Sequence, residues 1–277
     1  MVSDSPWIGV GELGAAFEKD VNLLPPSSDL AGRSFEFHYD DSSIERFAFE
    51  TEDRLVRSGL GERKPPESYR ATTMQPGKYF IDFVSQTERT MTISLFLDLE
   101  QKIFTSVIGR LPSETEALMS LPERRRSGKE LTGVAVDFVH GAVDEAIADI
   151  TPRHKTTVDL VGHRIEYIYS PTERYEHIYL NDSFYTWHCL SGAERGLADT
   201  DRCHYYKLGN KMYLFVWREK IVPTLGVVVL SLDAMKTTGK LFGYEGDDFG
   251  RVTNFPIGAK ARILNVTSHE RGGERHE

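Results

Sequence analysis

The chain has 277 residues, a formal net charge of −9 and a hydrophobic fraction of 40%, which is the composition of an ordinary globular protein. The acidic balance argues against broad nucleic-acid binding, and no apolar run reaches the roughly 18 residues that a membrane-spanning helix needs. The amino terminus lacks the pattern of a signal peptide, and the two cysteines, Cys189 and Cys203, provide no disulfide framework. We therefore expect a cytoplasmic protein without nucleic-acid or membrane partners, and the sequence leaves a homodimer open.

The first 29 residues are predicted to be a lead-in with a short helix over Glu12–Val21. From Leu30 the pattern changes to short strands of period two, separated by turns. For Val143–Ile150 the pattern fits either a strand or a short helix. The other elements expected in this half are a helix over Glu114–Leu121 and strands over Ser34–Tyr39, Ile44–Glu50, Tyr79–Val84, Thr90–Leu99, Ile103–Gly109 and Val134–His140.

The strand pattern occurs twice along the chain. The matching pairs of segments are Leu30–Tyr39 with Leu160–Tyr169, Tyr79–Val84 with Met212–Trp217, and Leu95–Glu100 with Val228–Asp233. A repeat that keeps its order over such a length predicts two related structural units. We expect an all-β protein with two tandem antiparallel barrel-like halves, 30–150 and 160–265, joined by residues 151–159.

The segment Met212–Glu219 is the strand around which the second half is organised. In an extended strand alternate side chains share a face, so one face carries Tyr213, Phe215, Trp217 and Glu219. The opposite face is apolar apart from Arg218, which predicts a central strand buried on both sides. Glu219 is then either a strand-end carboxylate, in water or paired with a lysine or arginine, or a carboxyl group with a raised pKa at the mouth of an aromatic cavity.

The two halves differ where chemistry would take place. Val84–Gln86 stands in the first half where Trp217–Glu219 stands in the second, and Phe37 takes the place of Tyr167. This difference predicts that any site lies in the second half, although repeats also drift apart without functional reason.

Three stretches of the second half, Trp187–Gly192, Gly196–Asp201 and Tyr213–Gly226, resemble the MoaF family. Members of that family have two lipocalin-like halves, so the resemblance implies tandem lipocalin-like (calycin-type) barrels. The family name suggests an accessory role in molybdenum cofactor metabolism.

The second half is also similar to phenolic acid decarboxylases, which are lipocalin-like enzymes without a cofactor. The matching residues are Tyr167 and Tyr169, Tyr175–Glu176, Asn181–Asp182 and Trp217–Glu219. The resemblance implies that Tyr167, Tyr169 and Glu219 are the functional residues. An arginine of those enzymes corresponds to Leu197 here, which puts binding of a substrate carboxylate, and with it simple decarboxylation, in doubt.

The residues themselves support proton transfer. Two tyrosines on one strand face can hold a ligand oxygen, and a desolvated Glu219 can donate or accept a proton. Core packing is the alternative for both tyrosines, and His188 is the substitute for Glu219. The histidines lack metal-ligand spacing, so we expect neither a metal nor another cofactor. The remaining candidates for ligand contact are Trp217, Tyr213, Phe215, Trp187, His204 and Arg202.

Two classes of function fit these residues. One is a cofactor-independent lyase or isomerase that acts on a small aromatic or conjugated carbonyl compound. The other is a carrier that binds an apolar molecule without changing it.

Overall fold

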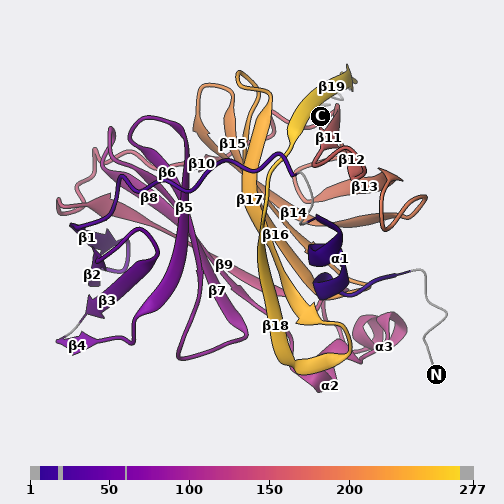
Figure 1. The fold of residues 1–277 in the computed structure, drawn as a ribbon, viewed down its shortest axis with the longest axis horizontal. Coiled ribbons are helices and arrows are strands. Elements are labelled where there is room, and N and C mark those ends of the chain that lie inside the picture. Colours follow the sequence, from indigo (N-terminus) through magenta and orange to yellow (C-terminus); the bar gives the residue numbers. More distant parts are fainter. Residues whose placement is uncertain (1–6, 18–20, 60, 269–277) are drawn as a thin grey trace, which may run out of the picture.

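A computed structural model describes residues 7–17, 21–59 and 61–268. They form two closed, eight-stranded antiparallel β-barrels that lie side by side (Figure 1). The predicted all-β class and tandem barrels are therefore confirmed. No helix in the described ranges has the length and apolar character needed to cross a membrane.

The first barrel follows the chain up and down, and it closes where β3 pairs with β2. A short strand, β4 (Glu62–Arg63), extends the β3 edge outside the ring. The strands of the ring are β1 (Arg33–Tyr39), β2 (Ile44–Phe49), β3 (Arg54–Gly59), β5 (Glu67–Gln75), β6 (Lys78–Val84), β7 (Met91–Asp98), β8 (Ile103–Arg110) and β9 (Ala135–Val143).

The second barrel repeats this topology, and it closes where β14 pairs with β15. Two strands lie outside its ring: β10 (Lys155–Thr156) pairs with β14, and β18 (Asp248–Ile257) pairs with β17. The strands of the ring are β11 (His163–Ile168), β12 (Arg174–Tyr179), β13 (Phe184–Ser191), β14 (Ala198–Gly209), β15 (Met212–Glu219), β16 (Thr224–Ser231), β17 (Lys236–Glu245) and β19 (Lys260–Val266).

The same turn opens both barrels and explains the first sequence match. Gly32 and Gly162 both have positive φ, at 75° and 87°, which glycine adopts without a Cβ penalty. Their amides donate to equivalent carbonyls, from Gly32 to Phe49 at 2.7 Å and from Gly162 to Tyr179 at 2.8 Å. The repeat therefore preserves a backbone requirement as well as a hydrophobic pattern.

The second sequence match is shifted by one residue in the structure. Tyr79, Ile81 and Phe83 face the interior of the first barrel, whereas Tyr213, Phe215 and Trp217 face the interior of the second. A shift of one residue turns every side chain to the opposite face of a strand. Tyr79 thus corresponds to Tyr213 instead of Met212, and Ser85 rather than Gln86 corresponds to Glu219.

The strand β15 is buried on both faces, as its sequence predicts. Its inner face fills the second barrel with aromatic rings. Its outer face, with Leu214 and Val216, joins an apolar layer between the barrels that also contains Phe80, Phe96 and Val107 of the first barrel. This layer fixes the two barrels against each other.

The helical elements differ from the prediction. The amino-terminal helix α1 spans Val10–Phe17, so it begins earlier than predicted, and residues 18–20 lie outside the described residues. A second helix predicted as one piece is two: α2 (Glu114–Ala117) and α3 (Leu121–Arg126), because Ser120 and Glu123 form a capping box that starts a new helix. Val143 ends β9, and neither a strand nor a helix follows it up to Ile150.

Helix α1 precedes the first barrel in sequence but lies against the second barrel (Figure 1). Its buried residues are Val10, Leu13, Gly14 and Phe17, the spacing of one helix face. Asn22 continues the attachment, because its backbone amide donates to the carbonyl of Tyr169 at 2.7 Å. The helix therefore covers the part of the second barrel where the candidate site lies.

Candidate functional site

A small cavity lies inside the second barrel, beneath α1. Its volume is about 30 Å³, which is room for one or two water molecules. Aromatic side chains form most of its wall, and three polar groups face it among them. The lining residues are Leu13, Phe17, Tyr169, Tyr175, His177, Tyr185, Trp187, Glu194, Trp217, Glu219 and Leu241.

Glu219 is the carboxyl group at the centre of this wall. Its Oε1 accepts a hydrogen bond from the indole Nε1–H of Trp217 at 2.9 Å. Burial raises the pKa of Glu219 well above its ordinary value of 4.5, and the neighbouring carboxylates of Asp201 and Glu194 raise it further. Glu219 ends β15 with part of its side chain exposed, and the raised pKa keeps its carboxyl group protonated over a wider pH range than that of a free glutamate.

Two further carboxyl groups lie beside Glu219, and each accepts from an aromatic donor. Trp187 Nε1 donates to Asp201 at 3.1 Å, and the hydroxyl of Tyr175 donates to Glu194 at 3.0 Å. Burial raises the pKa of Asp201 to about 6, against the opposing attraction of Lys220. Burial also raises the pKa of Glu194.

His177 adds an unsatisfied group to the cavity wall. Burial lowers the pKa of His177 to about 3, so the imidazole is neutral at physiological pH. Its Nδ1 is buried and has no hydrogen-bond partner among the described residues. A buried polar atom without a partner costs free energy, which a ligand that bonds to it would recover.

Four of the residues predicted from the sequence meet at this cavity: Tyr169, Trp187, Trp217 and Glu219. Two others lie deeper in the same barrel. The hydroxyl of Tyr167 bonds to that of Tyr179 at 2.6 Å, and Phe215 stacks between Tyr205 and Trp217. Tyr167 thus supports the packing of the barrel and does not line the cavity.

The other four predicted residues lie away from the cavity. His188 is on the outer face, where its Nδ1 lies 3.0 Å from Glu176. Tyr213 donates to Asp159 at 3.3 Å. His204 packs on Phe138 of the first barrel, and Arg202 lies over the ring of Phe184.

Sequence reasoning missed the partners that make Glu219 unusual. Glu194 follows β13, Asp201 lies on β14, and the α1 residues Leu13 and Phe17, which line the cavity, belong to the predicted lead-in. Period-two alternation would have placed Asp201 on the same face as Cys203 and Tyr205, which are buried. The register between β14 and β15, which brings Asp201 to Glu219, is not readable from either strand alone.

This arrangement can move a proton in a cavity with room for only one or two water molecules. A protonated Glu219 can donate to a ligand atom, whereas Asp201, whose pKa is about 6, does not line the cavity and accepts from Trp187 and Lys220. Environments that separate the pKa values of neighbouring acids are typical of acid–base pairs in enzymes. The same wall would also hold an apolar molecule without reaction.

Comparisons with known proteins find matches that together extend over nearly the whole chain. Residues 5–113 match the model of the MoaF N-terminal domain, and residues 154–267 match that of the MoaF C-terminal domain. The chain is 46% identical over 271 residues to Protein MoaF of Klebsiella aerogenes, a match that covers 98% of this chain and all of that protein.

A solved structure of a proposed beta-lactamase from Burkholderia vietnamiensis aligns with 38% of this chain and 96% of its own, at 11% identity and a TM-score of 0.33. So distant a likeness supports no inference about this chain. The two domain models and the full-length relative agree with the tandem barrels. The chain therefore belongs to the MoaF family.

Proposed function

We propose that this protein binds a small aromatic or conjugated carbonyl compound inside its second barrel, and that it acts on this compound as a cofactor-independent lyase or isomerase. The observation that carries the proposal is the carboxyl group of Glu219 in the wall of an aromatic cavity, with Asp201 and Glu194 beside it to raise its pKa. Structural packing alone gives no benefit from three neighbouring acids, because each loses hydration on burial.

The roles follow from the pKa directions. Glu219 is the proton donor, because burial and two like charges raise its pKa. Asp201 does not line the cavity; its pKa of about 6 leaves it mostly ionised at pH 7, and its charge raises the pKa of Glu219. Tyr169 and His177 orient the ligand, with the unpartnered His177 nitrogen bonding to a ligand atom. Tyr167 has a supporting role through Tyr179.

The size of the cavity adds a requirement. A volume of about 30 Å³ cannot hold an aromatic ring, so the ligand enters only if part of the wall moves. Helix α1 is the element best suited to move, because it belongs to neither ring and contributes Leu13 and Phe17. The ring of Phe17 lies 4.9 Å from that of Tyr169 and 6.0 Å from that of Tyr175. We therefore propose α1 as a lid.

The tryptophans provide an assay for binding. The chain has three, and all belong to this region: Trp187 and Trp217 line the cavity, and Trp7 packs edge-on against Trp187 at 5.7 Å. Intrinsic fluorescence therefore reports on the site. With 4-hydroxybenzaldehyde as the probe, we expect a saturable change in wild type and its loss in Leu241→Phe, which fills the cavity. An unchanged signal in wild type would contradict the binding proposal.

Catalysis needs a separate test. A ligand recovered by native mass spectrometry would identify the substrate class, and single-turnover rates would then be compared for Glu219→Gln and Glu36→Gln. Glu36 is the matched control because its side chain is 61% exposed on the first barrel. We expect Glu219→Gln to slow turnover by about 10²–10⁴-fold while it retains binding. Wild-type turnover in Glu219→Gln would refute the acid role.

The carrier function is the alternative, and the closed aromatic cavity supports it equally until turnover is measured. An accessory role in molybdenum cofactor metabolism has less support. Among the described residues that line the cavity there is no arginine or lysine, whereas a phosphorylated pterin would need cationic partners.

A further inference from the structure

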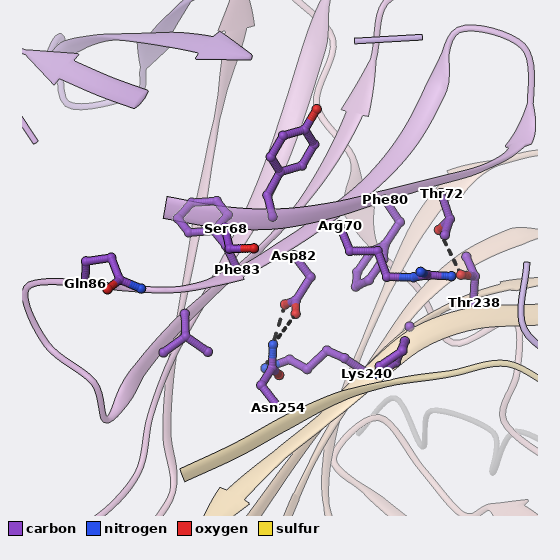
Figure 2. Close-up of a pocket in the computed structure, with 14 residues that line it drawn as sticks. Ser68, Arg70, Thr72, Phe80, Asp82, Phe83, Gln86, Thr238, Lys240 and Asn254 are labelled. Carbon is purple, nitrogen blue, oxygen red and sulfur yellow. Dashed lines mark hydrogen bonds and ion pairs between the residues drawn. The ribbon is translucent and has the colours of Figure 1, made fainter. Parts of the chain in front are cut away.

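A second and larger cavity lies in the cleft between the two barrels, at a distance from the aromatic site. Its volume is about 310 Å³, roughly ten times that of the barrel cavity. The strands β5 and β6 form one side, and β17 and β18 form the other (Figure 2). The lining residues are Ser68, Tyr69, Arg70, Thr72, Phe80, Asp82, Phe83, Val84, Gln86, Thr238, Gly239, Lys240, Asn254 and Pro256.

The internal repeat shows that the polar character of this cleft is not needed for packing. Strand pairing makes Val107 of β8 the counterpart of Lys240 on β17, and both are almost fully buried. Val107 packs in the apolar layer with Val216 and Val227. The same fold position is therefore filled by an apolar residue on one side of the interface and by a lysine on the other.

The surface that faces Lys240 has changed in the same way. Asp82, Thr92 and Ser94 of the first barrel are the counterparts of Val216, Leu225 and Val227 of the second, by the same strand pairing. One half of the interface is thus a hydrophobic contact, and the pseudo-equivalent half is polar. A buried charge is costly unless it is paired. Packing of the two barrels against each other therefore does not explain why this half of the interface is polar.

Asp82 is fully committed to neighbours in the structure. Its Oδ1 accepts from Ser94 at 2.7 Å, and its Oδ2 accepts from the amide of Asn254 on β18 at 2.6 Å. Lys240 donates to Thr92 at 3.1 Å, but its Nζ lies 3.9 Å from Asp82, beyond hydrogen-bond distance. The ammonium group also lies over the ring of Phe242 at 4.7 Å but has no carboxylate within hydrogen-bond distance, and burial lowers the pKa of Lys240 to about 8.

Arg70 brings a second positive charge to the cleft. Its Nη2 donates to the carbonyl of Leu24 at 2.6 Å. Within the described part of the chain, no carboxylate lies within ion-pair distance of Arg70. Of the described residues that line the cleft, two are cations, Arg70 and Lys240, and one is a carboxylate, Asp82. The cleft therefore has an excess of one positive charge.

The cleft also contains an acceptor that nothing satisfies. The Oδ1 of Asn254 is buried and has no hydrogen-bond partner among the residues described. Its amide nitrogen is already bonded to Asp82 (Figure 2). Phe80, Phe83, Val84 and Pro256 supply apolar wall on the same cavity. Charge, an unfilled acceptor and apolar surface thus converge on one space.

We propose that this cleft is a second binding site, for a small organic acid with an apolar body, whose carboxylate lies between Arg70 and Lys240. The volume suits a ligand of about ten heavy atoms, near the lower limit of ligand pockets. A monoanion neutralises the excess charge, and a hydroxyl group on the ligand can donate to Asn254 Oδ1. Because both barrels contribute residues, the ligand also bridges the two halves of the chain.

The test uses benzoate as the probe and benzamide as a neutral probe of the same shape. Binding is measured by calorimetry on the full chain, for wild type, Arg70→Gln and the double variant Asp82→Asn/Lys240→Met, with folding checked by thermal melting. The double variant removes both buried charges together, so that no unpaired carboxylate remains. We expect benzoate to bind at least tenfold more weakly to each variant, since each loses a charge-assisted hydrogen bond.

Two controls separate this site from the barrel. Leu241→Phe, which fills the barrel cavity, should leave benzoate binding at the cleft unchanged. Benzamide should bind wild type more weakly than benzoate and should not distinguish wild type from Arg70→Gln. Equal affinities of benzoate for wild type and both folded variants would overturn the proposal. The proposal would also fail if benzoate, at millimolar concentration and in tenfold molar excess, did not bind the wild type. It would fail as well if Leu241→Phe alone abolished benzoate binding.

Discussion

Replacing Glu219 by glutamine should stabilise the protein at neutral pH. The folded protein keeps Glu219 protonated well above the ordinary pKa of 4.5, because burial and the charges of Asp201 and Glu194 disfavour the carboxylate. The unfolded chain releases that proton near pH 4.5. The folded state then binds more protons than the unfolded state, so stability is greatest below this pH and falls as the pH rises toward the folded pKa.

The magnitude follows from linkage. Each pH unit in this window costs about 1.4 kcal/mol for one group, so the wild type should lose on the order of 1–3 kcal/mol between pH 5 and pH 7 through Glu219. Glutamine is neutral at every pH in this range and can still accept a hydrogen bond from Trp217 Nε1. The free energy of unfolding of Glu219→Gln should therefore fall less between pH 5 and pH 7 than that of the wild type. Asp201 has a raised pKa of about 6, which makes stability fall with rising pH in the wild type and in Glu219→Gln alike.

The assay is urea unfolding at pH 5, 6 and 7, followed by tryptophan fluorescence, which reports the second barrel. Wild type and Glu219→Gln should have similar midpoints at pH 5 and diverge as the pH rises, with the variant the more stable. Glu36→Gln, at an exposed position, should follow the wild type. Parallel curves for wild type and Glu219→Gln across this range would refute a raised pKa of Glu219.

Two further predictions concern the lid and the opening turns. Phe17→Ala should accelerate entry of 4-hydroxybenzaldehyde, measured by stopped-flow fluorescence, because it removes the ring that packs on Tyr169 and Tyr175; an unchanged entry rate would argue against α1 as the lid. Gly162→Ala should lower the free energy of unfolding more than Gly32→Ala, although both have positive φ and each substitution costs about 1 kcal/mol in strain. The difference arises because a Cβ at Gly162 would lie 2.1 Å from the carbonyl oxygen of Thr267, whereas one at Gly32 meets nothing within 4 Å; equal losses in urea unfolding would contradict this reasoning.

The fold was predictable because its signals are local and repeated. Phe35 and Phe37 alternate with polar residues, and Ile165 and Tyr167 do the same in the second half, so the hydrophobic period alone indicates paired strands. The strands β3 and β5 were missed because the segment Arg54–Gln75 contains many charged and hydroxyl side chains. Their burial depends on partners, as with Arg57, which is buried against Glu67 at 2.7 Å.

The candidate site was predictable only in part. Trp187, Trp217 and Glu219 lie on strands whose inward faces the sequence indicates, and Tyr169 directly follows β11. The groups that change the chemistry of Glu219 come from other elements, and their approach depends on strand register. His188 illustrates the limit: it neighbours Trp187 in sequence, but the pleat of β13 places the two side chains on opposite faces.

The duplication itself explains why two sites could arise in one chain. Each barrel contains a strand with two buried faces, so a substitution on β6 or β15 changes either a barrel interior or the surface between barrels.

In the interior, Phe83 of the first barrel corresponds to Trp217 of the second, and the acid beside it appears only in the second. At the interface, the acid appears only in the first barrel, as Asp82, and the lysine that faces it only in the second. Asp82 and Lys240 come from different halves of the chain. Only the packing of the two barrels brings these side chains together, so the sequence alone does not pair them. The interior change produces a site that one barrel could hold alone, whereas the interface change produces a site that exists only because the two copies remained in one chain.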